Sequence, residues 1–144
     1  MSFDLLVSDG DLQLAANRDL ATVTGTDKLI QDIIKIIVTP INGNPFFPWY
    51  GSPLGKSLIG RAMERRFVSS IATQQVRASL DRLQTLQKEQ LRKNQIVIPA
   101  EQLAAIQKVI VERNPQDPRF YTIDLTVLTK AFSRQQIPIS VRMT

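Results

Sequence analysis

The residue types that most catalytic and metal sites require are missing from this chain. It has 144 residues and contains neither His nor Cys. Zinc fingers, Ser-His-Asp triads, Cys/His dyads, haem ligation through His and disulfide scaffolds all depend on these side chains, so they are excluded. What remains is carboxylate, Lys, Arg or Ser chemistry, or no chemistry at all.

The carboxylates and serines do not form a recognisable catalytic pattern. Glycoside hydrolysis needs two carboxyl groups about 5–9.5 Å apart around a sugar cleft, one of them in a setting that keeps it protonated. Glu64 is the first glutamate, and it stands in an Arg-rich segment that would favour its ionised form. Ser52 follows Gly51 but lacks the G-x-S-x-G context and a base. We therefore predict no enzyme activity, no cofactor and no metal site.

Charge is distributed unevenly along the chain. Residues 1–32 hold six acids and two bases, a net charge of −4, whereas the remainder holds seven acids and sixteen bases, a net charge of +9. This asymmetry suits electrostatic docking of successive copies or of unlike protein partners as well as binding to a polyanion. Charge alone leaves these alternatives open.

Length and composition predict one compact domain over residues 1–144. Hydrophobic residues make up 43% of the chain, which is enough for a single core. The first residues lack the pattern of a secretory signal. Asp32 and Lys35 interrupt the most apolar stretch, so we expect no membrane-spanning helix and an intracellular, soluble chain.

The first part of the chain predicts a small hairpin followed by a buried helix. Residues 3–7 and 12–15 are apolar-rich and flank a Ser-Asp-Gly turn, and residues 20–23 are a possible third strand. Thr26 is the predicted N-cap of a helix that runs to about Val38, before Pro40. Its apolar residues recur at helical spacing around a wide stripe, which places the helix in the core: Leu29, Ile30, Ile33, Ile34, Ile36 and Ile37.

Residues 40–55 form an unusual loop, which we expect to be ordered. The segment holds four of the eight prolines, three of the six glycines and four of the nine aromatic residues. Prolines lower the entropy cost of fixing such a loop, and Phe46, Phe47, Trp49 and Tyr50 would bury a large apolar area. These aromatics pack either on the chain's own core or against a partner protein.

A long helix is predicted from about Val68 to Lys93, after a short helical segment that starts near Lys56. Its apolar stripe comprises Ile71, Val76, Leu80, Leu83, Leu86 or Gln87, and Leu91. Over residues 61–93 eight bases outnumber three acids. This basic face is interpreted as solvated, as a contact for an acidic protein, or as a nucleic-acid surface without the interleaved aromatics of a single-strand binder.

The last part of the chain predicts an antiparallel β-meander. One more helical turn is expected over residues 99–102, after which apolar residues alternate with polar ones. Tyr121, Ile123, Leu125 and Val127 mark a strand with one buried face. A turn at residues 133–136 precedes Ile137, Ile139 and Val141, which predict a third strand at the edge of the sheet. Its unpaired backbone groups could be completed by a strand of a partner.

The order of these residues resembles a known family. It is carried by Asp19-Leu20 through Gly25, Leu29-Ile30-Gln31 on a helix, Thr39, Gly43, and the loop Pro48-Trp49-Tyr50-Gly51-Ser52-Pro53-Leu54. This order is similar to the lysozyme-like baseplate wedge proteins of contractile phage tails, which are related to the wedge component of type VI secretion baseplates. The match follows most of the chain in order, and residues 19–55 carry its specific part.

The resemblance implies a fold, a role and a set of functional residues. The fold is α+β, with an N-terminal β-hairpin, central helices including one long helix, and a C-terminal antiparallel β-meander. The family motif residues are Gln31, Thr39, Gly43, Tyr50, Gly51, Ser52 and Leu54. Family members often carry a Glu-Pro-Arg element, whereas here Asp117-Pro118-Arg119 occurs later, inside the predicted hairpin. The candidate partner-binding residues are Phe46, Phe47, Trp49, Tyr50, Arg119, Ile137, Ile139 and Val141.

As a sheath initiator, the chain would be a structural virion component made in the host cytoplasm and located in the tail baseplate. Six copies around the tail would contact other wedge proteins, the tail tube and the sheath, without a membrane or a specific nucleic acid. The chain would nucleate sheath assembly by strand augmentation. Two alternatives remain: a basic nucleic-acid-binding module that uses residues 61–93, and a tail-completion or tube-adaptor protein.

Overall fold

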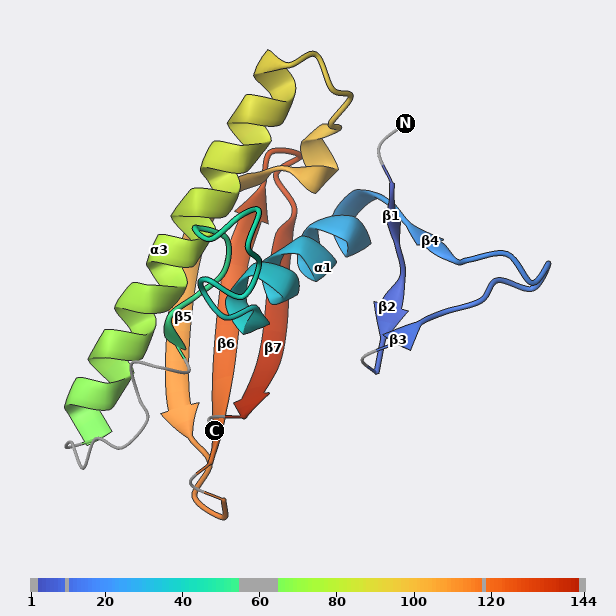
Figure 1. The fold of residues 1–144 in the computed structure, drawn as a ribbon. Helices are drawn as coiled ribbons and strands as arrows, with labels where there is room; N and C mark the ends of the chain where they lie inside the picture. Colours follow the sequence, from blue (N-terminus) through green and yellow to red (C-terminus); the bar gives the residue numbers. More distant parts are fainter. Residues whose placement is uncertain (1–2, 10, 55–64, 118, 143–144) are drawn as a thin grey trace.

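The chain folds into a mixed α/β body with a projecting N-terminal arm (Figure 1). A computed structural model describes residues 3–9, 11–54, 65–117 and 119–142. Within these residues there are two α-helices and antiparallel strands in three sheets, which confirms the predicted mixture of helix and strand. In chain order the elements are β1 (Asp4–Leu5), β2 (Val7–Ser8), β3 (Asp11–Leu12), β4 (Thr22–Val23), α1 (Gly25–Val38), α3 (Arg65–Arg92), the 3-10 turn η1 (Pro99–Glu101), β5 (Leu103–Arg113), β6 (Phe120–Thr129) and β7 (Arg134–Arg142).

The helix α1 begins earlier than expected. Thr24, in an extended conformation, is the N-cap instead of Thr26, and its side chain makes no capping hydrogen bond. The Gly25 N–H instead donates to Glu101 Oε1 at 3.1 Å, so a buried side chain from a distant segment satisfies a backbone donor at the start of the helix. The helix ends at Val38, because Pro40 follows an extended Thr39.

The core lies between the two helices and one face of the C-terminal sheet. α1 contributes Leu29, Ile33, Ile36 and Ile37, all buried. Figure 1 shows α3 running beside β5 while α1 lies across β6 and β7, and the contacts of α3 with β5 and of α1 with β7 agree. Each fully buried aliphatic side chain contributes about 1.5–3 kcal/mol to folding, so this layer is the main source of stability.

The three-stranded sheet has the order β5-β6-β7, which confirms the predicted C-terminal meander. Tyr121, Ile123, Leu125 and Val127 of β6 are all buried, as their alternation with polar residues predicted. β7 pairs in regular antiparallel register with β6, from Phe120 opposite Arg142 to Leu128 opposite Arg134. Among the strands that the structure describes, β6 is the only neighbour of β7, so β7 is an edge strand.

Two local predictions are corrected by the structure. The turn before β7 is not at residues 133–136, because β7 already begins at Arg134. The Thr129 N–H donates to the Ser133 carbonyl, and Phe132 adopts a left-handed φ of 61°, so the chain reverses before Arg134. The helical stripe of α3 also differs, since Ala72 and Ser79 are buried whereas Leu91 is exposed; of the two alternatives Leu86 and Gln87, Gln87 is the buried one. The short helical segment predicted near residues 56–63 lies outside the described residues.

The N-terminal arm, residues 3–9 and 11–24, lies on the far side of α1 from α3 (Figure 1). β2 and β3 form the predicted hairpin, with Val7 opposite Leu12, and the expected third piece pairs as β4 with β1. Several apolar side chains of the arm are exposed: Phe3, Val7, Leu12, Leu14 and Leu20. The arm therefore adds little to the chain's own core.

Candidate interaction surfaces

Gln31, a residue of the sequence motif, fixes the arm to α1. Its Nε2 donates to Asp4 Oδ2 at 3.0 Å and to the Leu5 carbonyl at 2.8 Å, and its Oε1 accepts from the Val7 N–H at 3.0 Å. The amide thus bonds the backbone of the arm as a neighbouring strand would. Gln31 is half-buried and positions the arm, so it is not a free surface group.

An ion-pair chain on α1 strengthens this attachment. Lys35 Nζ contacts Asp4 Oδ2 and lies 3.2 Å from Asp32 Oδ1, and Asp32 also accepts from Lys28 at 2.9 Å. Burial acts to raise the pKa of Asp4, but the hydrogen bond and charge of Lys35 and the Gln31 amide outweigh it, so the net pKa is lowered. Burial acts to lower the pKa of Lys35, but Asp4 and Asp32 raise it overall. Both groups are therefore charged near neutral pH.

The arm should loosen in acid. Because the pKa of Asp4 is lowered in the fold, its contribution is present above the unfolded value of about 3.9 and is lost as the pH falls through the folded value. The Lys35 contribution changes only above about pH 10.4. Between pH 6 and pH 3 we expect the amide-exchange protection factor of Val7 to fall by up to about fivefold, or under about 1 kcal/mol for this partly exposed pair.

The measurement is NMR hydrogen exchange corrected for the intrinsic rate at each pH. Asp4→Asn should remove the pH dependence, and Asp9→Asn, another carboxyl of the arm, should retain it. Equal pH dependence in wild type and Asp4→Asn would show that Asp4 does not control the attachment.

The other motif residues close the base of the loop that spans residues 40–53, here called the aromatic loop. The Ser52 N–H donates to the Thr39 carbonyl at 2.8 Å, and the Ile41 N–H donates to the Ser52 carbonyl at 3.2 Å. The Gly51 carbonyl accepts from Arg82 Nη1 at 2.7 Å, which ties the loop to α3. Leu54 is buried in the core. The motif residues therefore hold the base of the aromatic loop in place.

Two motif glycines stand where the backbone comes very close. A Cβ on Gly43 would lie 2.8 Å from the Pro40 carbonyl oxygen. Gly51 has a φ of 117°, and a Cβ there would lie 2.4 Å from the Thr39 carbonyl oxygen. Both positions require glycine for steric reasons.

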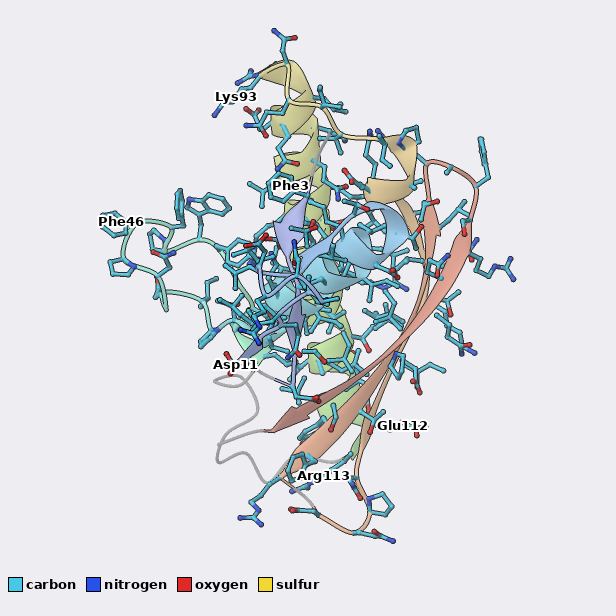
Figure 2. All side chains as sticks on the ribbon, turned by 90° about the vertical axis from the view of Figure 1, so that its right-hand side faces the viewer. Phe3, Asp11, Phe46, Lys93, Glu112 and Arg113 are labelled. Atoms are coloured by element: carbon cyan, nitrogen blue, oxygen red, sulfur yellow. The ribbon has the colours of Figure 1, made fainter. Side chains whose placement is uncertain are left out.

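The aromatic side chains of the loop divide between core and surface. Phe46 is 86% exposed, and Phe47 and Trp49 are also exposed, whereas Tyr50 is half-buried and packs against the core. Figure 2 shows Phe46 at the outer end of the loop, directed away from the helices. Phe47 and Trp49 meet edge to face, with ring centroids 5.9 Å apart. The loop therefore presents three aromatic rings outward and anchors itself with one.

The backbone of β7 presents unpaired groups at alternate residues. The Thr129 N–H donates a hydrogen bond to the Ser133 carbonyl, and the pairing of β6 with β7 continues from these two residues. Because hydrogen-bonded pairs alternate along an antiparallel ladder, the odd-numbered residues of β7 bond to β6. Gln136, Pro138 and Ser140 consequently direct their backbone groups to the free edge. Pro138 has no N–H, and an edge-facing position is where a sheet tolerates proline.

The predicted partner residues of β7 have buried side chains. Ile137 and Ile139 belong to the core and are 2% and 5% exposed, and Val141 is half-buried against it. A partner strand would therefore meet the backbone at Gln136 to Ser140 rather than these apolar side chains. The alternation that identified the strand is also the reason that its isoleucines face inward.

Three of the basic residues singled out in the sequence contact neighbouring residues of the chain. Arg119 forms an exposed ion pair with Asp117, with Nε and Oδ1 3.2 Å apart, in the β5–β6 connection. On α3, Arg82 bonds the Gly51 carbonyl and Arg92 pairs with Glu89 at 2.9 Å. These contacts give two bases of the predicted basic face a role within the chain.

Within the described residues, no three acidic side chains gather as metal ligands, and neither helix is long and apolar enough to cross a membrane. Glu64 lies outside the described residues. Comparisons of the chain with protein-family models, with curated proteins and with solved structures found no match.

Proposed function

We propose that this chain is a structural subunit of a contractile phage tail baseplate, joining wedge core to tail tube and nucleating the sheath by strand augmentation. The observation that carries the proposal is the free edge of β7, which is nine residues long and pairs with β6 alone among the described strands. An antiparallel edge of this length offers enough backbone groups to receive a partner strand.

The aromatic loop supports the same role. Phe46, Phe47 and Trp49 lie on a loop whose base is tied to both α1 and α3 through Ser52 and Gly51. A pre-shaped aromatic surface loses little entropy when it binds, and aromatic residues are enriched in the energetic centres of protein interfaces. The loop suits contact with wedge or tube proteins, and the edge of β7 suits contact with the sheath.

The edge is tested most sharply by proline substitution at Ser140. The Ser140 N–H faces away from β6, so Ser140→Pro removes a donor for the partner and leaves the ladder to β6 intact. We expect baseplates that carry Ser140→Pro to nucleate sheath at least about tenfold less often than wild type. Negative-stain imaging of assembled tails provides the count.

Ser140→Thr is the matched control, because it changes the side chain and keeps the N–H. It should nucleate sheath as wild type does, and thermal unfolding should give both variants similar stability. Equal nucleation by the proline and threonine variants would contradict strand augmentation. Particles that lack the subunit altogether should carry tubes without sheath, whereas particles without tubes would favour a tube-adaptor role.

A further inference from the structure

A second surface lies between the arm and α1, and these two elements supply its lining residues. A groove of about 760 Å³ runs there, and this volume is within the range of ligand-binding pockets in proteins. Its apolar lining comes from both walls: Leu6, Val7 and Val23 from the arm, and Ile30, Ile34 and Val38 from α1. Val7 is 43% exposed and Val38 is 47% exposed, so the groove presents apolar surface to solvent.

The α1 wall has the spacing of a helix-packing ridge. Ile30, Ile34 and Val38 are four residues apart, so they line up along one side of the helix, next to the residues that enter the core. Ridges of this spacing receive the side chains of another helix, and a groove between two apolar walls is the usual site for an amphipathic helix. The groove is therefore shaped for a helix.

The charged side chains that line the groove indicate which charges a bound helix would carry beside its apolar face. Asp9 and Asp27 line the groove and are exposed. Lys35 also lines it, but its ammonium group is engaged by Asp4 and Asp32. The groove consequently carries negative charge that is not matched by a free lysine of its own lining, which favours a partner with Lys or Arg beside its apolar face.

The two walls of the groove are already fixed relative to each other in the free protein. Gln31 bonds the arm backbone at Leu5 and Val7, and Lys35 contacts Asp4. These contacts fix the spacing between the two walls, so a helix would bind without first ordering the arm.

We propose that this groove binds an amphipathic helix of another protein, with apolar side chains on one face and basic residues on its flanks.

The probe is a fluorescein-labelled helical peptide of about 18 residues, about 27 Å long, with leucines three and four residues apart and lysines on the flanks. A matched peptide has glutamate in place of every lysine. By fluorescence anisotropy at low salt, we expect the lysine peptide to bind at least about tenfold more tightly.

Val38→Lys tests the location of binding. The substitution places a positive charge in the groove and suits the C-terminal end of α1, so the fold should be retained. We expect it to weaken the lysine peptide at least about tenfold. Phe132→Lys adds the same charge on a side chain that is 88% exposed in the β6–β7 turn, and it should bind as wild type does. Asp9→Asn with Asp27→Asn should weaken binding and flatten its salt dependence.

Three outcomes would overturn the proposal. They are equal binding of the lysine and glutamate peptides, equal losses in Val38→Lys and Phe132→Lys, and a wild-type dimer in sedimentation that Val38→Lys dissociates. The last result would assign the groove to a second copy of the chain. None of these measurements depends on sheath assembly, so the groove and the β7 edge are tested separately.

Discussion

Replacing Gly51 with alanine is expected to lower the free energy of unfolding by about 3 kcal/mol or more, which corresponds to about 10 °C in Tm for a chain of this size. The new Cβ would lie 2.4 Å from the Thr39 carbonyl oxygen. The Cβ is fixed rigidly to its Cα and the oxygen belongs to the backbone, so no side-chain rotation can separate them. The left-handed φ of 117° adds strain. Relief would require the Ser52–Thr39 hydrogen bond to break and the base of the aromatic loop to open.

Thermal unfolding by circular dichroism gives the stability, and the fluorescence of Trp49, the only tryptophan, reports on the loop. Gly25→Ala is the matched control, since Gly25 also has a positive φ but has no atom within 4 Å of its Cβ position. It should cost only about 1 kcal/mol and leave the Trp49 emission unchanged. Equal losses in both variants would mean that φ strain, rather than the close approach to Thr39, determines the requirement for glycine.

Replacing Gln87 with leucine is expected to cost about 2–4 kcal/mol, although it introduces a more apolar side chain into a buried site. Gln87 is 6% exposed, its Nε2 donates to the Glu101 carbonyl at 2.9 Å, and its Oε1 accepts from the Leu103 N–H at 2.8 Å. The leucine would leave both backbone groups buried without a partner, and each such group costs about 1–3 kcal/mol.

Urea unfolding measures the loss, and Gln74→Leu provides the control on an exposed position of the same helix. That variant should change stability by less than about 0.5 kcal/mol. A Gln87→Leu protein as stable as Gln74→Leu would show that η1 and β5 rearrange to pair their own backbone groups. Gln87 would then be a packing residue rather than the link between α3 and the sheet.

The parts of the fold that follow from local periodicity were predictable from the sequence. The apolar residues of α1 recur at helical spacing because one continuous element is buried on most of its sides. The strict alternation around Ile123 in β6 and Ile137 in β7 reflects a sheet with one covered face. Both patterns arise within a few residues, so no knowledge of distant neighbours was needed.

The contacts that position the candidate surfaces were not predictable in this way. Gln31 was singled out by its place in a motif, but its bonds to the arm join residues far apart in the chain. Glu101 pairs with the start of α1 across 76 residues, and this displaced the expected N-cap at Thr26. Exposure of Phe46 and burial of Tyr50 likewise depend on where the loop lies over α3, which residue types alone do not reveal.

Pro138 makes the exposed edge of the sheet selective. A second molecule that approached edge to edge would find a carbonyl but no donor at the centre of β7, so two such edges cannot join through an unbroken row of backbone bonds. A strand of a different protein can avoid this gap in two ways. It can place an irregular position opposite Pro138, or it can pair with β7 on only one side of the proline. The same residue thus disfavours edge-to-edge association of two copies and would set the alignment of any partner strand that paired with β7.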